Sequence, residues 1–289
     1  MSLIERYDSN QLRDYSSLFS RNSVQEWIQG DFSSIRVKVK RYDNTWFDNR
    51  GASYLDYLKY VYGVLEDHYQ NEYILKNTFL NEWLFEELGE YNSKLYNEFR
   101  VGDAIADLAM FNGSSKVFEI KTEFDSDRRL KMQLENYQRA FNQVFLIIPS
   151  SKISLYERYD KNVGIILFNS NYEQSFAVYR EAKIQSDVDS AAIMNILHTR
   201  EYKEIVQAYF GDLPPMTSFN QFNICSSLIQ EMPTCALNEH FIAQMKKRGS
   251  KNALSKRYFR EFNQISLAMK MDKQDRKQML QALKSKIEE

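Results

Sequence analysis

The sequence has few of the residues that mark disulfide-rich, zinc-binding or turn-rich proteins. Among its 289 residues there are only two cysteines, Cys225 and Cys235, which cannot form a disulfide framework and fit no zinc spacing. Nine glycines and four prolines exclude a collagen-like or low-complexity chain and disfavour a turn-rich all-β architecture. With His68, His198 and His240 as the only histidines, no tri-histidine zinc site is expected. The composition instead favours long helices around a sizeable core.

Long hydrophobic segments are also missing. No apolar run reaches the length of a membrane span, and residues 1–10 lack the apolar region of a signal peptide. We therefore expect a cytoplasmic protein without a membrane partner.

The charge is nearly balanced overall but is unevenly distributed. The net charge is −1, yet residues 246–289 carry thirteen Lys/Arg and five Asp/Glu, a net charge of +8. The preceding residues hold 25 basic and 34 acidic side chains, a net charge of −9. An acidic body with a basic tail indicates a nucleic acid or another acidic surface as partner. The alternative is a solvated helical face.

Seven cations in this tail lie within fifteen residues, with Tyr258 and Phe259 among them. Helical spacing would place Lys256 and Arg260 one turn apart, and Lys247 and Lys251 likewise. Cations gain from counterion release on phosphates, and aromatic rings can stack on unpaired bases. The predicted nucleic-acid contacts are Lys246, Lys247, Arg248, Lys251, Lys256, Arg257 and Arg260.

Three consecutive regions are expected along the chain. Residues 1–69 read as a mainly helical extension, although the alternation over residues 35–40 predicts one strand there. Residues 70–185 combine a helix ending near Gly89 with short β-rich runs and another helix, which predicts an α/β core with a mixed sheet. Residues 186–289 read as an all-helical region. The strand signals cover residues 95–101, 105–112, 116–123, 144–149, 163–169 and 176–179, and the helix after the third begins near Asp125-Ser126-Asp127.

Polar side chains gather on two of these strands. By strand alternation, Glu119 and Lys121 share one face, while Phe118 and Ile120 point to the other and would be buried. A hairpin about the Asn112-Gly113 step would bring Asp107 near Glu119. Two carboxylates beside a lysine suit Mg²⁺, which keeps its remaining positions for water and phosphate oxygens.

The spacing of Glu119 and Lys121 is not specific by itself, because the chain contains three such E-x-K triplets. Only this triplet has an acidic strand before it and a helix after it. That helix adds Gln133 and Tyr137, one turn apart on a single face.

These residues, in this order, resemble the active-site signature of the PD-(D/E)xK nuclease superfamily: Asp107, then Glu119-Ile120-Lys121, then residues 133–137. The Q-x-x-x-Y element is similar to that of the RecB-like branch. Ala106 stands where the family commonly has proline, a departure that removes no ligand. The wider context of residues 97–130 also resembles an uncharacterised bacterial "sce"-type family named after a locus tag, over roughly residues 70–180.

The resemblance implies a restriction-endonuclease-like core and a role for each matched residue. Asp107, Glu119 and the backbone carbonyl of Ile120 would hold Mg²⁺ or Mn²⁺. Lys121 would orient the attacking water and stabilise charge at phosphorus. Glu72, on the preceding helix, matches the family's helix carboxylate and would bind a metal or its waters. Gln133 and Tyr137 would position the nucleic acid or the water.

Each residue also has a plainer interpretation. Glu119 and Lys121 could form an exposed ion pair, and Tyr137 could simply pack in the core. Glu72 lies four residues before Lys76, an ordinary helix-surface pair. His68 could add a ligand, but its place on an apolar stripe favours a core histidine.

The leading hypothesis is a Mg²⁺-dependent nuclease acting on DNA, in bacterial defence, repair or a mobile element. The nearest rival is an RNA nuclease, because no feature of the sequence indicates whether the 2′-hydroxyl that distinguishes RNA from DNA is recognised. A different class of function is a catalytically silent nuclease-fold platform that binds protein or nucleic acid, against which the intact Asp107, Glu119 and Lys121 set argues. A protein partner or a homodimer stays open.

Overall fold

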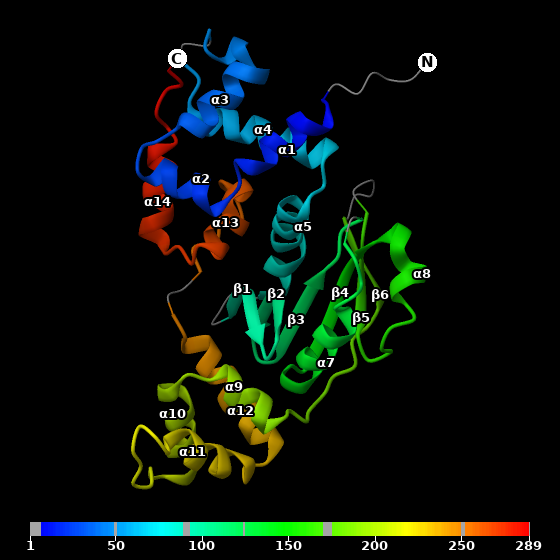
Figure 1. The fold of residues 1–289 in the computed structure, drawn as a ribbon, viewed down its shortest axis with the longest axis vertical. Helices are drawn as coiled ribbons and strands as arrows, with labels where there is room; N and C mark the ends of the chain where they lie inside the picture. The colour runs from blue at the N-terminus through cyan, green and yellow to red at the C-terminus, as the bar shows by residue number, and fades with distance from the viewer. Residues whose placement is uncertain are drawn as a thin grey trace. The chain divides into compact units, whose positions relative to one another are not determined.

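The structure, a computed structural model, describes residues 7–48, 51–88, 93–123, 125–169, 175–249 and 252–288. The chain forms two compact units (Figure 1): the helical unit, Met1–Phe85 with Ser250–Glu289, and the sheet unit, Glu86–Gly249. The first and last parts of the chain thus share one unit, whereas the sequence suggested three consecutive regions.

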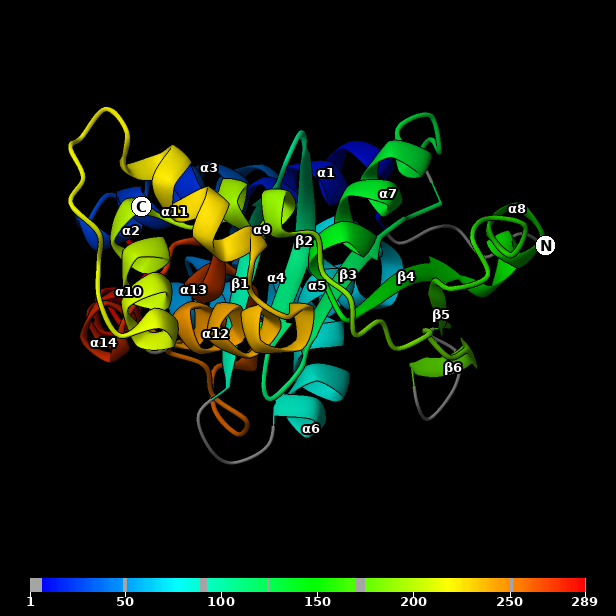
Figure 2. The ribbon, with the colours of Figure 1, turned by 90° about the horizontal axis from the view of Figure 1, so that it is seen from below.

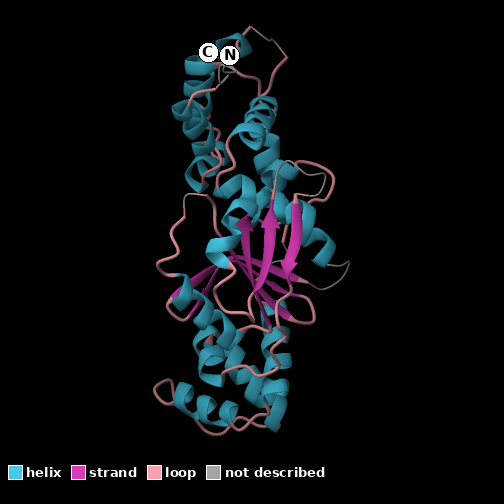
Figure 3. Cartoon of the chain, turned by 90° about the vertical axis from the view of Figure 1, so that its right-hand side faces the viewer, coloured by secondary structure: helices cyan, strands magenta, loops and turns pink. Residues whose placement is uncertain are grey.

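A six-stranded mixed sheet forms the centre of the sheet unit, with the strands in chain order. The β1–β2, β2–β3 and β5–β6 pairs are antiparallel, and the β3–β4 and β4–β5 pairs are parallel. The α/β class with a mixed sheet and helical extensions is therefore confirmed, and Figure 3 shows the strands in magenta among the helices. The strands are β1 (Lys94–Val101), β2 (Ala104–Phe111), β3 (Ser115–Ile120), β4 (Gln143–Pro149), β5 (Gly164–Phe168) and β6 (Phe176–Arg180).

Both tight turns of the first three strands use glycine in the left-handed region. Gly113, with a φ of +122°, lies in the predicted hairpin between β2 and β3. Gly102, with a φ of +58°, joins β1 to β2, and a Cβ atom there would lie 2.6 Å from Oδ1 of Asn136. The small residue at this turn therefore lets the helix that carries Asn136 approach the sheet.

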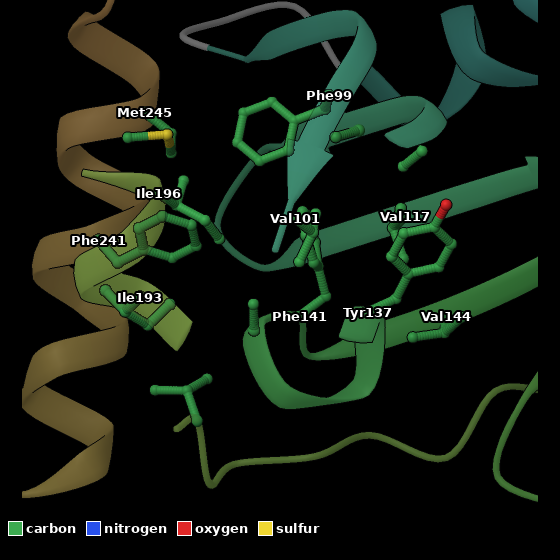
Figure 4. Close-up of a cluster of buried hydrophobic side chains, with 14 of the residues drawn as sticks. Phe99, Val101, Val117, Tyr137, Phe141, Val144, Ile193, Ile196, Phe241 and Met245 are labelled. Carbon is green, nitrogen blue, oxygen red and sulfur yellow. The ribbon is translucent and has the colours of Figure 1, made fainter. Parts of the chain in front are cut away.

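Helix α7 (Leu130–Ala140) connects β3 to β4 and packs against β1, β2 and β4. It buries Leu130, Leu134 and Tyr137, as its apolar spacing predicts. Figure 4 shows the resulting core, in which Ile193 and Phe241 face Phe141 and the strand residues.

The remaining helices of the sheet unit follow the strands in the chain. Figure 2 shows α9, α10, α11 and α12 gathered next to β1 and β2, with β6 at the other end of the sheet. Asp189 caps the first of them by accepting hydrogen bonds from the backbone N–H groups of Ala191 and Ala192. These elements are η3 (Ser150–Lys152), α8 (Ile153–Tyr156), α9 (Ser190–Ile196), α10 (Thr199–Phe210), α11 (Gln221–Gln230) and α12 (Thr234–Lys247).

The helical unit has its own core, in which aromatic residues pack among aliphatic ones. Trp27, Tyr57 and Phe262 are fully buried within it. Its two chain segments are tied together where Leu55 donates its N–H to the carbonyl of Leu283. The elements are α1 (Ser9–Ser17), α2 (Arg21–Ile28), α3 (Ser33–Tyr42), η1 (Asn44–Trp46), α4 (Tyr54–His68), α5 (Glu72–Phe79), η2 (Leu80–Leu84), η4 (Arg260–Phe262), α13 (Asn263–Ala268) and α14 (Lys273–Ala282), and α6 (Phe85–Leu88) leads into the sheet unit.

Three local predictions were wrong. Residues 35–40, predicted as a strand, lie in α3, where Ile35 and Val39 are buried one turn apart. Helix α7 begins after Arg129 without a side-chain cap, and Asp125 accepts from the N–H and hydroxyl of Thr122. Residues 252–259, predicted as part of an all-helical region, are not helical, so Lys256 and Arg260 do not lie one helical turn apart. The predicted cap at Gly89 lies outside the described residues.

No helix among the described residues is long and apolar enough to cross a membrane.

Candidate functional site

The hairpin of β2 and β3 brings the two predicted carboxylates together. Leu108 pairs with Phe118, so the next position of the same register places Asp107 opposite Glu119. Oδ2 of Asp107 accepts a hydrogen bond from the backbone N–H of Ile120 at 2.7 Å. Asp107 is therefore fixed against the end of β3.

Asp107 lies where the other ladder of β2 is interrupted. Asn97 pairs with Leu108 and Phe99 with Ala106, but the intervening Glu98 has a φ of +53°. Such left-handed backbone in a residue other than glycine is strained and is concentrated at functional sites. Glu98 carries no periodic or motif signal in the sequence that would mark it as a site residue.

Three side chains hold the Glu119 carboxylate. Nζ of Lys121 donates to Oε1 at 2.8 Å, and Nε2 of Gln133 donates to the same oxygen at 2.7 Å. The hydroxyl of Tyr137 donates to Oε2 at 2.8 Å. Nζ of Lys121 also donates to Oε1 of Gln133 at 3.3 Å. Strand β3, the residue after it and one face of α7 thus converge on one carboxylate.

Glu119 is buried, which the alternation of β3 did not predict. It is 3% exposed, and Lys121 is 8% exposed, so the two do not form the exposed ion pair considered above. Burial is the largest cause of a raised pKa of Glu119, and the charge of Asp107 raises it further. Lys121 and Tyr137 oppose the shift. The negative charges of Asp107 and Glu119 therefore lie close together, and Lys121 and Tyr137 offset only part of the resulting cost.

Tyr137 serves both the core and the carboxylate. Its ring is fully buried beside Val117 and Val144, and Figure 4 shows its oxygen pointing out of that cluster. Burial and the Glu119 carboxylate raise the pKa of Tyr137 well above its ordinary value, so the hydroxyl stays protonated and remains a donor.

This contact gives a stability prediction. Tyr137→Phe should lower the free energy of unfolding by about 1.5–3 kcal/mol, because a buried charged group loses a hydrogen bond while the ring stays in place. Chemical denaturation measures this difference. Tyr159→Phe is the matched control, since its hydroxyl also donates to a carboxylate, Asp127, but at the surface. Equal losses for the two variants would contradict a special role for the Tyr137 hydroxyl.

The donor set suits a hard cation that keeps most of its water. No group of three or more Asp, Glu, His or Cys side chains arranged to hold a metal occurs in the described part of the chain. The site therefore offers two carboxylates, Asp107 and Glu119, with the backbone of Ile120 beside them. Because the N–H of Lys121 bonds β4 at Ile147, the N–H and carbonyl of Ile120 are directed to the β2 side, next to Asp107. Mg²⁺ accepts one or two carboxylates plus waters and phosphate oxygens, and the residues fit that requirement.

The two remaining ligand candidates belong to the helical unit. Glu72, in the first turn of α5, pairs with the buried Lys76 at 2.5 Å, as its four-residue spacing suggested. Its predicted metal role stays a prediction. His68 is exposed at the end of α4, with its ring 5.2 Å from that of Tyr7, so the core interpretation of His68 was wrong.

The residues predicted to contact nucleic acid differ in their exposure and in their bonded partners. Arg248 is bonded within the sheet unit and is not available to a partner in this arrangement. Its Nε donates to Glu201 at 2.7 Å, and its guanidinium also donates to the second Glu201 oxygen and to the carbonyl of Ile196. Lys246 is half-buried and Lys247 is exposed at the end of α12. Lys251 lies outside the described residues.

Lys256, Arg257 and Arg260 are exposed in the helical unit, beside the 70% exposed Tyr258. Nζ of Lys256 lies 5.8 Å from the centre of the Phe85 ring. Apart from Arg248, the described cations of this set are therefore compatible with a polyanion partner.

Sequence comparisons connect the chain to a bacteriophage protein. The model of the family described as bacteriophage P4 protein cII matches residues 66–284. Protein cII of Enterobacteria phage P4 is 30% identical over 134 residues, which are 45% of this chain and 51% of the phage protein. The chain thus spans about half the length of this curated relative.

A solved structure of a protein of unknown function from Silicibacter pomeroyi overlaps 49% of this chain and 92% of its own, at 13% identity. Its TM-score of 0.31 is too low to establish a shared fold. The match to the phage family covers most of the chain, including Asp107, Glu119, Lys121, Gln133 and Tyr137. The chain belongs to the family of bacteriophage P4 protein cII.

Proposed function

We propose that the protein is a metal-dependent nuclease that hydrolyses phosphodiester bonds, with DNA favoured over RNA as substrate. The observation that carries the proposal is the buried Glu119 carboxylate, held by Lys121, Gln133 and Tyr137 and facing Asp107 on the neighbouring strand. A role in a mobile element, rather than in defence or repair, is supported by the phage origin of the 30% identical relative.

In the proposed mechanism Asp107, Glu119 and the carbonyl of Ile120 would hold Mg²⁺ or Mn²⁺. Such a cation would lower the pKa of a bound water and offset charge on the scissile phosphate. Lys121 would hold the attacking water and stabilise the charge that develops at phosphorus. Gln133 and Tyr137 would act as positioning residues, because they hold Glu119 and Lys121 rather than reach outwards.

A cleavage assay tests this function. Purified protein would be incubated with linear DNA, circular DNA and RNA, each in Mg²⁺, Mn²⁺ and EDTA. The expected result is cleavage of DNA in either metal and none in EDTA. Cleavage of RNA alone would favour the rival nuclease. No cleavage by folded protein under any condition would favour the silent platform, for which the three donors already bound to Glu119 are the supporting observation.

The basic residues give a separate prediction about substrate binding. Replacing Lys246, Lys247, Lys251 and Lys256 by glutamine should weaken duplex DNA binding for all sequences, and should reduce the salt slope by about 0.9 per lost phosphate contact. Binding titrations at several salt concentrations measure both quantities. Arg248→Gln is the informative comparison, because Arg248 is engaged by Glu201 and its loss should reduce stability instead. Unchanged affinity and salt slope in the fourfold variant would remove these lysines from the interface.

A further inference from the structure

A pocket of about 300 Å³ opens within the helical unit, between α14 and the residues around Leu254 and Phe259. Its lining includes four cations, Lys273, Arg276, Lys277 and Lys284, and contains no carboxylate. None of the residues assigned to the nuclease site lines this pocket. Its volume is at the small end of the range for small-molecule sites.

Arg276 is a buried cation whose hydrogen bonds go to neutral acceptors. It is 7% exposed, and its guanidinium donates to the carbonyls of Ala253 and Phe259 at 2.6 and 2.7 Å and to Oδ1 of Asn263 at 2.5 Å. Burial lowers the pKa of Arg276 to about 10, and Glu261 opposes the shift only through space. No carboxylate in the described residues bonds this guanidinium. A buried charge without a bonded counter-charge is costly and is relieved by an anion.

The three lysines add exposed positive charge at the same pocket. Lys273 and Lys277 are one helical turn apart on α14, and Lys284 follows it. None of the three forms an ion pair within the described part of the chain. Like charges placed together in this way favour a multiply charged anion.

The pocket also has an aromatic wall in a strained conformation. Phe259 has a φ of +55°, in the left-handed region, and its carbonyl is held by Arg276. Nζ of Lys59 lies 5.0 Å from the centre of the Phe259 ring. Strained backbone of this kind is typical of ligand clamps. An aromatic surface beside a cluster of cations is the combination that binds bases and phosphates together.

We propose that this pocket binds a nucleotide, with its phosphates on Lys273, Lys277 and Lys284 and its base against Phe259 and Leu254. The buried charge of Arg276 strengthens the positive potential behind the phosphates. The nucleotide has two possible sources, a free nucleoside triphosphate or the 5′-phosphorylated end of a strand. The site lies in the helical unit and does not depend on hydrolysis at Glu119.

The test is competition for a fluorescent ATP analogue, followed by anisotropy in EDTA, where metal-dependent cleavage does not proceed. The 289-residue protein should bind the analogue, and ATP should displace it at least about tenfold more effectively than adenosine, which lacks phosphates. A 5′-phosphorylated oligonucleotide that competes better than ATP, and better than its unphosphorylated form, identifies a strand end as the source. Otherwise the source is the free nucleotide.

The double variant Lys273→Gln/Lys277→Gln should lose at least about tenfold in affinity for the analogue. Lys40→Gln/Lys286→Gln removes the same charge from exposed positions that do not line the pocket, and should bind as the wild type does. Absence of binding by the folded wild type, equal competition by adenosine and ATP, or equal losses in both double variants would overturn the proposal. Cleavage activity is read separately, so failure here leaves the nuclease proposal untouched.

Discussion

Replacing Lys121 by methionine should lower the rate constant of phosphodiester cleavage by about 100- to 10,000-fold. The ammonium of Lys121 lies within the Glu119 carboxylate network and has little exposed surface for binding a distant phosphate. Its contribution is therefore expected in the transition state, so nucleic-acid affinity should fall by no more than about threefold. Single-turnover kinetics and a binding titration of the same variant separate the two effects.

Lys131→Met is the control for this substitution, because Lys131 lies on α7 with its side chain 84% exposed. It should cleave at the wild-type rate. Comparable losses of rate and affinity in Lys121→Met would instead make Lys121 a phosphate contact. A folded Lys121→Met variant with full activity would remove it from the mechanism.

Asp107→Asn should weaken Mn²⁺ or Mg²⁺ binding at least about tenfold, because the described site offers only two carboxylates to the cation. Calorimetric titration with Mn²⁺ measures this directly. Asp103→Asn, at an exposed position in the turn before β2, should bind as the wild type does. Unchanged binding in Asp107→Asn would exclude Asp107 as a ligand.

The pH dependence of the same titration has a defined sign. A carboxylate must be ionised to bind a metal, and burial together with Asp107 raises the pKa of Glu119 above its ordinary 4.5. Metal affinity in the wild type should therefore begin to fall at a pH above 4.5 as the solution is acidified. Raising the pH through the pKa of Glu119 restores affinity but places a charge in the buried site, which lowers stability in the absence of metal.

Strand alternation and helical spacing predicted much of the candidate site. Asp107 and Glu119 meet across the hairpin at Gly113, and Gln133 and Tyr137 lie on one face of α7. Alternation could not predict that Glu119 is buried, because it assigns faces of a strand but not what covers each face. Tyr137 is a similar case. Its spacing predicts that the ring lies in the core but does not predict which group its hydroxyl bonds.

The errors arise where long-range contacts decide the structure. The alternation at Ile35, Val37 and Val39 fits a strand, yet Ile35 and Val39 also share one helix face, and the core of the helical unit buries them as such. Arg248 belongs by sequence to a basic tail, but its partner Glu201 is 47 residues away. No local pattern contains that pairing.

The most direct test of the proposed nuclease site is cleavage of linear duplex DNA in Mg²⁺ by the wild type and by Glu119→Gln, with thermal unfolding of both proteins recorded in the same buffer. The variant keeps the size of the side chain and removes the charge to which Lys121, Gln133 and Tyr137 donate. The predicted result is cleavage by the wild type and none by the folded variant. Cleavage at equal rates by the two proteins would contradict the assignment of this site.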